Sequence, residues 1–190
     1  AYQWIEKKAI QQSSAGIFVT QSSLNHYTLT YPDKDANYWH LVENGYDEDL
    51  FPSRNGIISP VAQKSKNRPI KMLHSGILYS KGRNPSPFFK ALGSYLRKKN
   101  IAIEVTLRGS GIEMDIEKWV SSFNLKNVVK IKPSIPYSDA IKEMIDSDVL
   151  LLFQGAEYNK QIPAKVYEYI RADRPILALI NDQGETAGQL

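Results

Sequence analysis

The sequence predicts an α/β protein with a Rossmann-like parallel sheet and helices on both faces of that sheet. After Pro69, short apolar runs alternate strictly with amphipathic helical patterns. Strands and helices that alternate in this way form right-handed β-α-β units, whose strands are parallel. The run Val149-Leu-Leu-Leu-Phe153 reads as a strand buried on both faces, as parallel strands are.

The expected elements follow in chain order. Before Pro69 we expect a helix at 1–14, a strand at 16–20, a helix at 22–31 and a strand at 38–42. In the α/β series we expect strands at 70–74, 101–107, 128–131, 149–153 and 176–179. Helices are expected to begin near Ser86, Ile112, Tyr137 and Pro163, with another at Gly184. Ser86-Pro87 is expected to cap and start the first of these helices. The helix from Tyr137 has an apolar stripe expected to face the core: Tyr137, Ala140, Ile141, Met144 and Ile145.

Composition divides the chain into three parts. Residues 46–69 include a stretch rich in Pro, Ser, Asn, Lys and Gln, which favours a linker. We expect residues 1–45 to be the end of a preceding domain, and residues 70–190 to be the Rossmann-like domain, truncated at its C-terminus. The chain is therefore interpreted as an excised piece of a longer protein. Apolar surface left bare on residues 1–45 would favour a dimer of the piece.

Overall composition excludes several classes of protein. Hydrophobic content of 42% and charged content of 23% are those of a soluble globular chain. No apolar run approaches the ~20 residues of a membrane span, and no cysteine is available for disulfides or thiolate metal sites. The net charge of +4 comes mainly from residues 64–68 and 97–99. The first interpretation of this excess is a set of solvated surface cations. The second is attraction to polyphosphate ligands or to an anionic membrane surface.

One helix start has the features of an anion site. Pro163 fits the first position of the helix, but Ile162 is a poor N-cap, so the first N–H groups have no obvious partner. Such helix ends, at the carboxyl end of a parallel strand, bind phosphates. One turn on, Lys165 and Glu168 share a polar face, whereas Val166, Tyr169 and Ile170 are expected to face the core. The alternative is a Lys165–Glu168 surface pair.

Three loops leave the same edge of the predicted sheet, and a helix-starting turn follows the last strand. In the loop after residue 75, Gly76 allows a close backbone approach, and Lys81 and Arg83 could meet a diphosphate. The loop at 132–137, the loop at 154–161 and the turn Gly184-Glu185-Thr186 complete this edge. Solvated cations, helix-start chemistry and capping are the competing explanations.

These residues also carry a family resemblance. Pro163, Lys165, Tyr-Glu168-Tyr and the Arg174-Pro-Ile strand resemble the donor region of retaining GT-B glycosyltransferases, in particular the family 4-like group that builds bacterial surface polysaccharides. The strand and turn Tyr38-Trp-His-Leu-Val-Glu-Asn-Gly-Tyr-Asp47 resemble the end of the N-terminal domain of such enzymes. The resemblance implies a sugar transferred, with retention, from a nucleotide diphosphate sugar to a polysaccharide or lipid-linked acceptor.

The resemblance also implies residue roles. Glu168 would hold the ribose, while Arg83, Lys81 and the helix end at Lys165 would hold the diphosphate. Ile135 would offer backbone groups to the nucleobase, and Gly184, Glu185 and Thr186 would lie near the diphosphate and sugar. Catalytic residues are not identified, and no cofactor, metal or nucleic acid is expected.

The sequence departs from the family pattern at two positions. Ile77 stands where an arginine is usual, and Lys160 stands where many members have a first glutamate, which would be absent or displaced to Glu157. A nucleotide-binding regulatory or degenerate domain without transferase activity is therefore the alternative function. Of the three histidines, only His74 lies at the candidate site. We expect a cytoplasmic protein, with peripheral contact to the inner membrane surface left open, and an isolated piece without catalytic activity.

Overall fold

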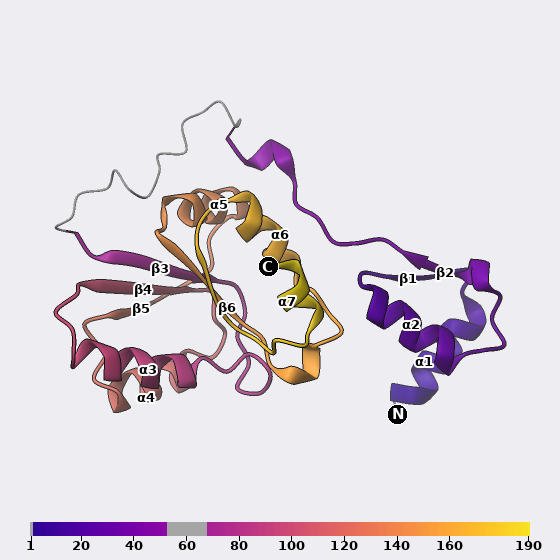
Figure 1. Cartoon of the computed structure of the whole chain (residues 1–190), viewed down its shortest axis with the longest axis horizontal. Coiled ribbons are helices and arrows are strands. Elements are labelled where there is room, and N and C mark those ends of the chain that lie inside the picture. The colour runs from indigo at the N-terminus through magenta and orange to yellow at the C-terminus, as the bar shows by residue number, and fades with distance from the viewer. Residues whose placement is uncertain (1, 53–67) are drawn as a thin grey trace.

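A computed structural model describes residues 2–52 and 68–190 (Figure 1). Most of the predicted linker, and with it most of the basic cluster at 64–68, lies outside the described residues. No described helix combines the length and apolarity needed to cross a bilayer.

A five-stranded parallel sheet with the order β5-β4-β3-β6-β7 forms the centre of residues 68–190, called the α/β unit below. This confirms the predicted fold class. The strands are β3 (Ile70–Ser75), β4 (Ile103–Arg108), β5 (Val129–Lys132), β6 (Val149–Phe153) and β7 (Ile176–Leu179). The last two match the predicted ranges, and Pro175 stands directly before β7.

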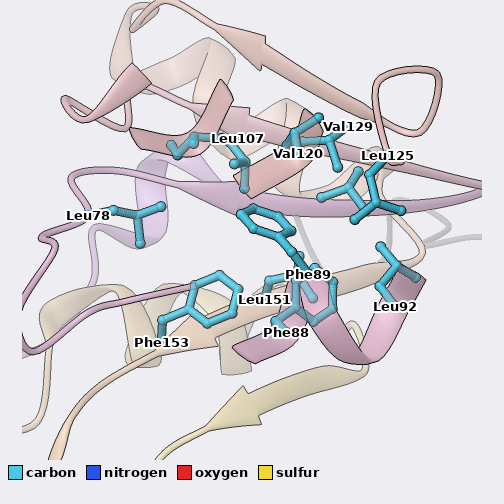
Figure 2. Close-up of a cluster of buried hydrophobic side chains, with 12 residues drawn as sticks. Leu78, Phe88, Phe89, Leu92, Leu107, Val120, Leu125, Val129, Leu151 and Phe153 are labelled. Atoms are coloured by element: carbon cyan, nitrogen blue, oxygen red, sulfur yellow. The ribbon is translucent and has the colours of Figure 1, made fainter. Parts of the chain in front are cut away.

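Helices cover both faces of this sheet, as Figure 1 shows. One face carries α3 (Ser86–Leu96) and α4 (Glu113–Ser122), and the other carries α5 (Tyr137–Asp146) and α6 (Ala164–Arg171). The short helix α7 (Glu185–Gln189) follows β7. Phe89 from α3 lies in the larger core cluster with Leu107 and Leu151 from the sheet (Figure 2). Tyr169 from α6 lies in the second cluster, with Leu73 and Leu150. The alternating pattern therefore builds two cores, one on each face.

Three details of the helices differ from the predictions. Helix α6 begins at Ala164, and Pro163 is its N-cap, without a side-chain cap. Ser86 is the first residue of α3 rather than its cap; its N–H donates to Asn84 Oδ1 at 2.8 Å. Ile170 is 44% exposed, so its expected place in the core was wrong. The next residue, Arg171, is buried instead. Its guanidinium donates to the Glu48 carboxylate.

The N-terminal segment, residues 2–45, is a small unit of its own (Figure 1). It contains α1 (Tyr2–Gln12), β1 (Gly16–Phe18), α2 (Gln21–Thr30) and β2 (Trp39–Leu41), and the two strands pair in parallel. Its core consists of Ile10, Tyr38 and Trp39. The predicted elements are present, but they bury few residues.

Residues 47–51 lead away from this segment and pack on the α/β unit. Glu48 begins a 3₁₀ helix, Glu48–Leu50, and Phe51 enters the core cluster of Tyr169. The Arg171 guanidinium lies 5.0 Å from the centre of the Phe51 ring. The first residues of the predicted linker are therefore held by α6.

Candidate functional site

The carboxyl ends of β3 and β6 meet the start of α6, and Lys165 lies at this junction. Its Nζ donates to the Ser75 carbonyl oxygen at 2.7 Å. Gly76 has φ of +111°, and a Cβ there would lie 2.8 Å from Nζ. Only glycine combines that conformation with this close approach. In this structure a lysine side chain closely approaches the Gly76 backbone, and the predicted approach to a ligand stays a prediction.

Burial changes the acidity of this lysine. Desolvation, followed by the positive charge of Arg83, lowers the pKa of Lys165 to about 8 from its usual 10.5, while Glu168 opposes the shift. An ammonium held in such surroundings gains from an added anion, because the anion would offset both causes. The uncapped N-terminus of α6, two residues earlier, contributes partial positive charge of the same sign.

Glu168 lies one helical turn after Lys165, but the two side chains do not form the surface ion pair of the alternative interpretation. Oε1 of Glu168 accepts a hydrogen bond from the Tyr137 hydroxyl at 2.5 Å. Oε2 has no hydrogen-bond partner among the residues that the structure describes. The site therefore offers one occupied and one free carboxylate oxygen.

The loop after β3 holds Arg83 between two aromatic rings. Its guanidinium lies 5.4 Å from the ring centre of Tyr79 and 5.7 Å from that of Tyr158. The loop is tied to the end of β6, because Gly155 N–H donates to the Gly82 carbonyl at 2.5 Å. Arg83 Nε is buried and has no hydrogen-bond partner among the described residues. The predicted Arg83 is thus brought close enough to Lys165 to lower that pKa, whereas Lys81 is exposed.

His74 lies beneath this junction as a neutral side chain. It is 1% exposed, and burial, with the charge of Lys165, lowers its pKa to about 3. Nδ1 lies 2.8 Å from the Leu151 carbonyl oxygen, which can only accept, so Nδ1 carries the proton. Nε2 is then an acceptor, and it is buried without a partner in the described part of the chain.

The remaining predicted residues lie at the same edge with partners of their own. Ile135 is half-buried in the loop that leads from β5 to Pro136, the N-cap of α5. Thr186 is buried and donates to Gln154 Oε1 at 2.8 Å. Gly184 is the N-cap of α7, and Glu185 Oε1 accepts the Ser22 N–H at 2.9 Å. Contact of these residues with a ligand stays a prediction.

Lys160 stands where many family members have a first glutamate, and Glu157 is the position to which that glutamate would be displaced. The two residues face different parts of the molecule. The carbonyl of Lys160 accepts the hydroxyls of Thr20 at 2.5 Å and Ser23 at 2.7 Å, so its backbone faces the N-terminal segment. The Glu157 carboxylate lies against Gly82 and Gly155, where a Cβ would meet its oxygens. Glu157 is therefore at the loop that holds Arg83.

Sequence reasoning missed Tyr137, Tyr79 and Tyr158. Tyr137 was expected in the core stripe of its helix, but it is 46% exposed and bonds to Glu168 instead. As the first residue of α5, it lies before the helix has turned its side chains onto the sheet. Its place directly after a proline, at the end of the loop that leaves the carboxyl end of β5, was the available signal.

Comparisons with known proteins identify the fold. No protein-family model matches the chain. Alpha-maltose-1-phosphate synthase of Mycobacterium tuberculosis is 29% identical over 83 residues, which are 42% of this chain and 21% of the synthase. The chain thus spans about a fifth of the length of that curated relative.

Solved structures match over nearly the whole chain. HepE of Anabaena in complex with UDP-glucose has a TM-score of 0.67 at 16% identity, covering 95% of this chain and 48% of HepE. The fold is that of the GT-B glycosyltransferases. Sucrose-phosphate synthase from Thermosynechococcus elongatus (TM-score 0.63, 15% identity, 94% of this chain and 44% of that one) shares it. S. aureus TarM also shares it, with a TM-score of 0.61 at 14% identity, covering 92% of this chain and 32% of TarM. The predicted GT-B fold is therefore confirmed.

Proposed function

We propose that this chain is the donor-binding part of a glycosyltransferase, which transfers a sugar from a nucleotide diphosphate sugar to a polysaccharide or lipid-linked acceptor. The observation that carries the proposal is the arrangement on α6. A half-buried ammonium and a carboxylate with a free oxygen stand one turn apart, beside an uncapped helix end at the carboxyl edge of a parallel sheet. A diphosphate needs cations and N–H groups, and a ribose diol needs an acceptor such as a carboxylate.

The three parts of a donor match three parts of this edge. Lys165, Arg83 and the N–H groups of α6 would bind the diphosphate, because cations and helix N-termini stabilise phosphate charge. Glu168 would accept hydrogen bonds from the ribose diol. The backbone at Ile135 would meet the nucleobase. UDP is the first nucleotide to test, because HepE, with the same fold, was solved with UDP-glucose.

Calorimetric titration with UDP, GDP and ADP tests this proposal. Glu168→Gln keeps the shape of the side chain and removes its charge. Since a hydrogen bond to a charged group contributes about 1.5–3 kcal/mol, this variant should weaken binding roughly ten- to a hundredfold. Absence of binding by all three nucleotides in the unchanged chain would refute the proposal.

The alternative is a nucleotide-binding domain without transferase activity. It is favoured by Lys160, which stands at the place of a first glutamate and turns its carbonyl toward the N-terminal segment. Both functions predict nucleotide binding, so transfer must decide between them. We propose that the longer protein transfers sugar with retention and that these 190 residues alone do not. Release of UDP from UDP-sugars by the longer protein, with acceptor supplied, separates the two.

A further inference from the structure

Lys165 and Glu168 are close enough in sequence to neutralise each other, yet the structure keeps them apart. Side chains three residues apart on a helix are neighbours, and opposite charges at that spacing attract. Here the ammonium turns to the Ser75 carbonyl, and the carboxylate turns to the Tyr137 hydroxyl. Each of the two charges has a neutral partner, and each therefore keeps its charge available to a ligand.

We propose that Tyr137 is a positioning residue of the donor site, which holds the Glu168 carboxylate away from Lys165 and leaves Oε2 facing the ribose diol. The inference rests on the proposed function, since it assigns Tyr137 a task toward the same nucleotide. Tyr137 acts through Glu168 and is not itself assigned a contact with the ligand.

The backbone around Tyr137 suits this task. Pro136 precedes it as the N-cap of α5 with φ of −52°, an angle that the proline ring restricts. Tyr137 therefore begins α5 from a stiff turn at the end of the β5 loop, and its hydroxyl reaches a different helix, α6. A hydrogen bond between two helices on one face of the sheet fixes the carboxylate relative to the strand ends.

The protonation of the phenol supports the direction of this hydrogen bond. Partial desolvation of the half-exposed ring, followed by the hydrogen bond to Glu168 and the charges of Glu168 and Asp47, raises the pKa of Tyr137 to about 12. At neutral pH the phenol therefore keeps its proton and donates it to Glu168. A carboxylate that accepts one such bond on Oε1 is held in one rotamer, so it loses less conformational freedom when a second donor binds Oε2.

Loss of the phenol hydroxyl should release Glu168. The freed carboxylate could then pair with Lys165, which would lower the charge available to the diphosphate and the number of acceptors available to the ribose. We expect Tyr137→Phe to weaken UDP binding by roughly three- to tenfold, a part of the energy of one charge-assisted hydrogen bond. The preference for UDP over 2′,3′-dideoxy-UDP should fall, because that preference depends on how well Glu168 is placed.

The experiment compares four forms of the 190-residue chain by calorimetry with UDP and 2′,3′-dideoxy-UDP: unchanged, Tyr137→Phe, Glu168→Gln and Tyr95→Phe. Tyr95 is the matched control, since it is 45% exposed against 46% for Tyr137, lies on α3, and its hydroxyl has no hydrogen-bond partner among the described residues. A melting curve of each form reports stability. The inference is supported if Tyr137→Phe loses affinity and diol preference while Tyr95→Phe keeps both.

Three results would count against the inference, and they are distinguishable. If Tyr137→Phe lowers only the melting temperature, the hydrogen bond merely joins two helices. If it tightens UDP binding, Tyr137 competes with the ribose for Glu168 and the proposed role is reversed. If the unchanged chain binds UDP, GDP and ADP not at all, the proposed function fails and the inference fails with it.

Discussion

The α/β unit and the N-terminal segment differ in how they bury their apolar residues. The α/β unit places a sheet between two helix layers, and side chains such as Phe89, Leu151 and Tyr169 are almost fully enclosed. The N-terminal segment has one two-stranded sheet, and its core is the cluster of Ile10, Tyr38 and Trp39. Large apolar side chains remain exposed on it: Tyr2, Trp4, Ile5, Ile17 and Leu29.

The difference shows which part of the chain can support a site. A unit with little enclosed surface gains little free energy on folding, so the N-terminal segment depends on contacts with its neighbour. Those contacts are hydrogen bonds to the loop before α6 and to α7, from Thr20, Ser23, Asn44 and the Ser22 N–H. All the described candidate ligand groups, in contrast, stand on the well-packed unit. Self-association through the exposed apolar side chains stays a prediction.

The largest effect is expected from a cavity in the larger core. Phe89→Ala removes a ring that is 0% exposed and should destabilise the α/β unit by about 3–5 kcal/mol. Ile10→Ala should affect mainly the N-terminal segment, because Ile10 lies in the core cluster of that segment. Hydrogen exchange resolved by peptide measures both regions in one experiment. Equal loss of protection in the α/β unit for both variants would contradict the comparison.

A smaller effect is expected at Gly76. A side chain there would take up φ of +111° and press on the Lys165 ammonium, so Gly76→Ala should cost about 1–3 kcal/mol and weaken UDP binding. Gly45→Ala is the control, since a Cβ there meets nothing within 4 Å. Urea denaturation and calorimetry of both variants measure the two effects. A Gly76→Ala protein with normal stability and affinity would show that the contact at Lys165 is unimportant.

The pH dependence should have opposite signs for stability and binding. The pKa of Lys165 is lowered to about 8 from 10.5, so between these values the folded chain loses the proton while the unfolded chain keeps it. Stability should therefore rise as the pH increases above 8, because the buried charge disappears. UDP affinity should fall over the same range. Lys165→Met should remove both trends between pH 7 and 9.5, and trends unchanged in that variant would assign them to another group.

The smallest effect is expected at the contact between the two regions. Glu185→Ala removes the acceptor of the Ser22 N–H, and loss of one such bond costs about 0.5–1.5 kcal/mol. Thr20 still caps α2, so only the first turn of that helix should exchange its amide protons faster. Melting of the α/β unit should not change, and a large drop there would show that the two regions fold as one.

The sequence predicts repeating features better than contacts between distant residues. Strands β6 and β7 were predicted at their observed bounds because apolar runs and a proline mark them. The uncapped start of α6 was also predictable, since Ile162 and Pro163 cannot cap through a side chain. Tyr137 could not be paired with Glu168, which lies 31 residues later on another helix. Likewise, only the packing shows that Lys165 fills the space above Gly76, or that Ile170 is turned outward.

The central claim is that the carboxyl edge of the α/β unit binds a nucleotide sugar without help from the N-terminal segment. Titration of the ¹⁵N-labelled chain with UDP-glucose, followed by amide NMR, tests it most directly. We predict saturable shifts at Gly76, Ile135, Lys165 and Glu168, and none at residues 2–19. Shifts concentrated in the N-terminal segment, or no shifts at all, would contradict the claim.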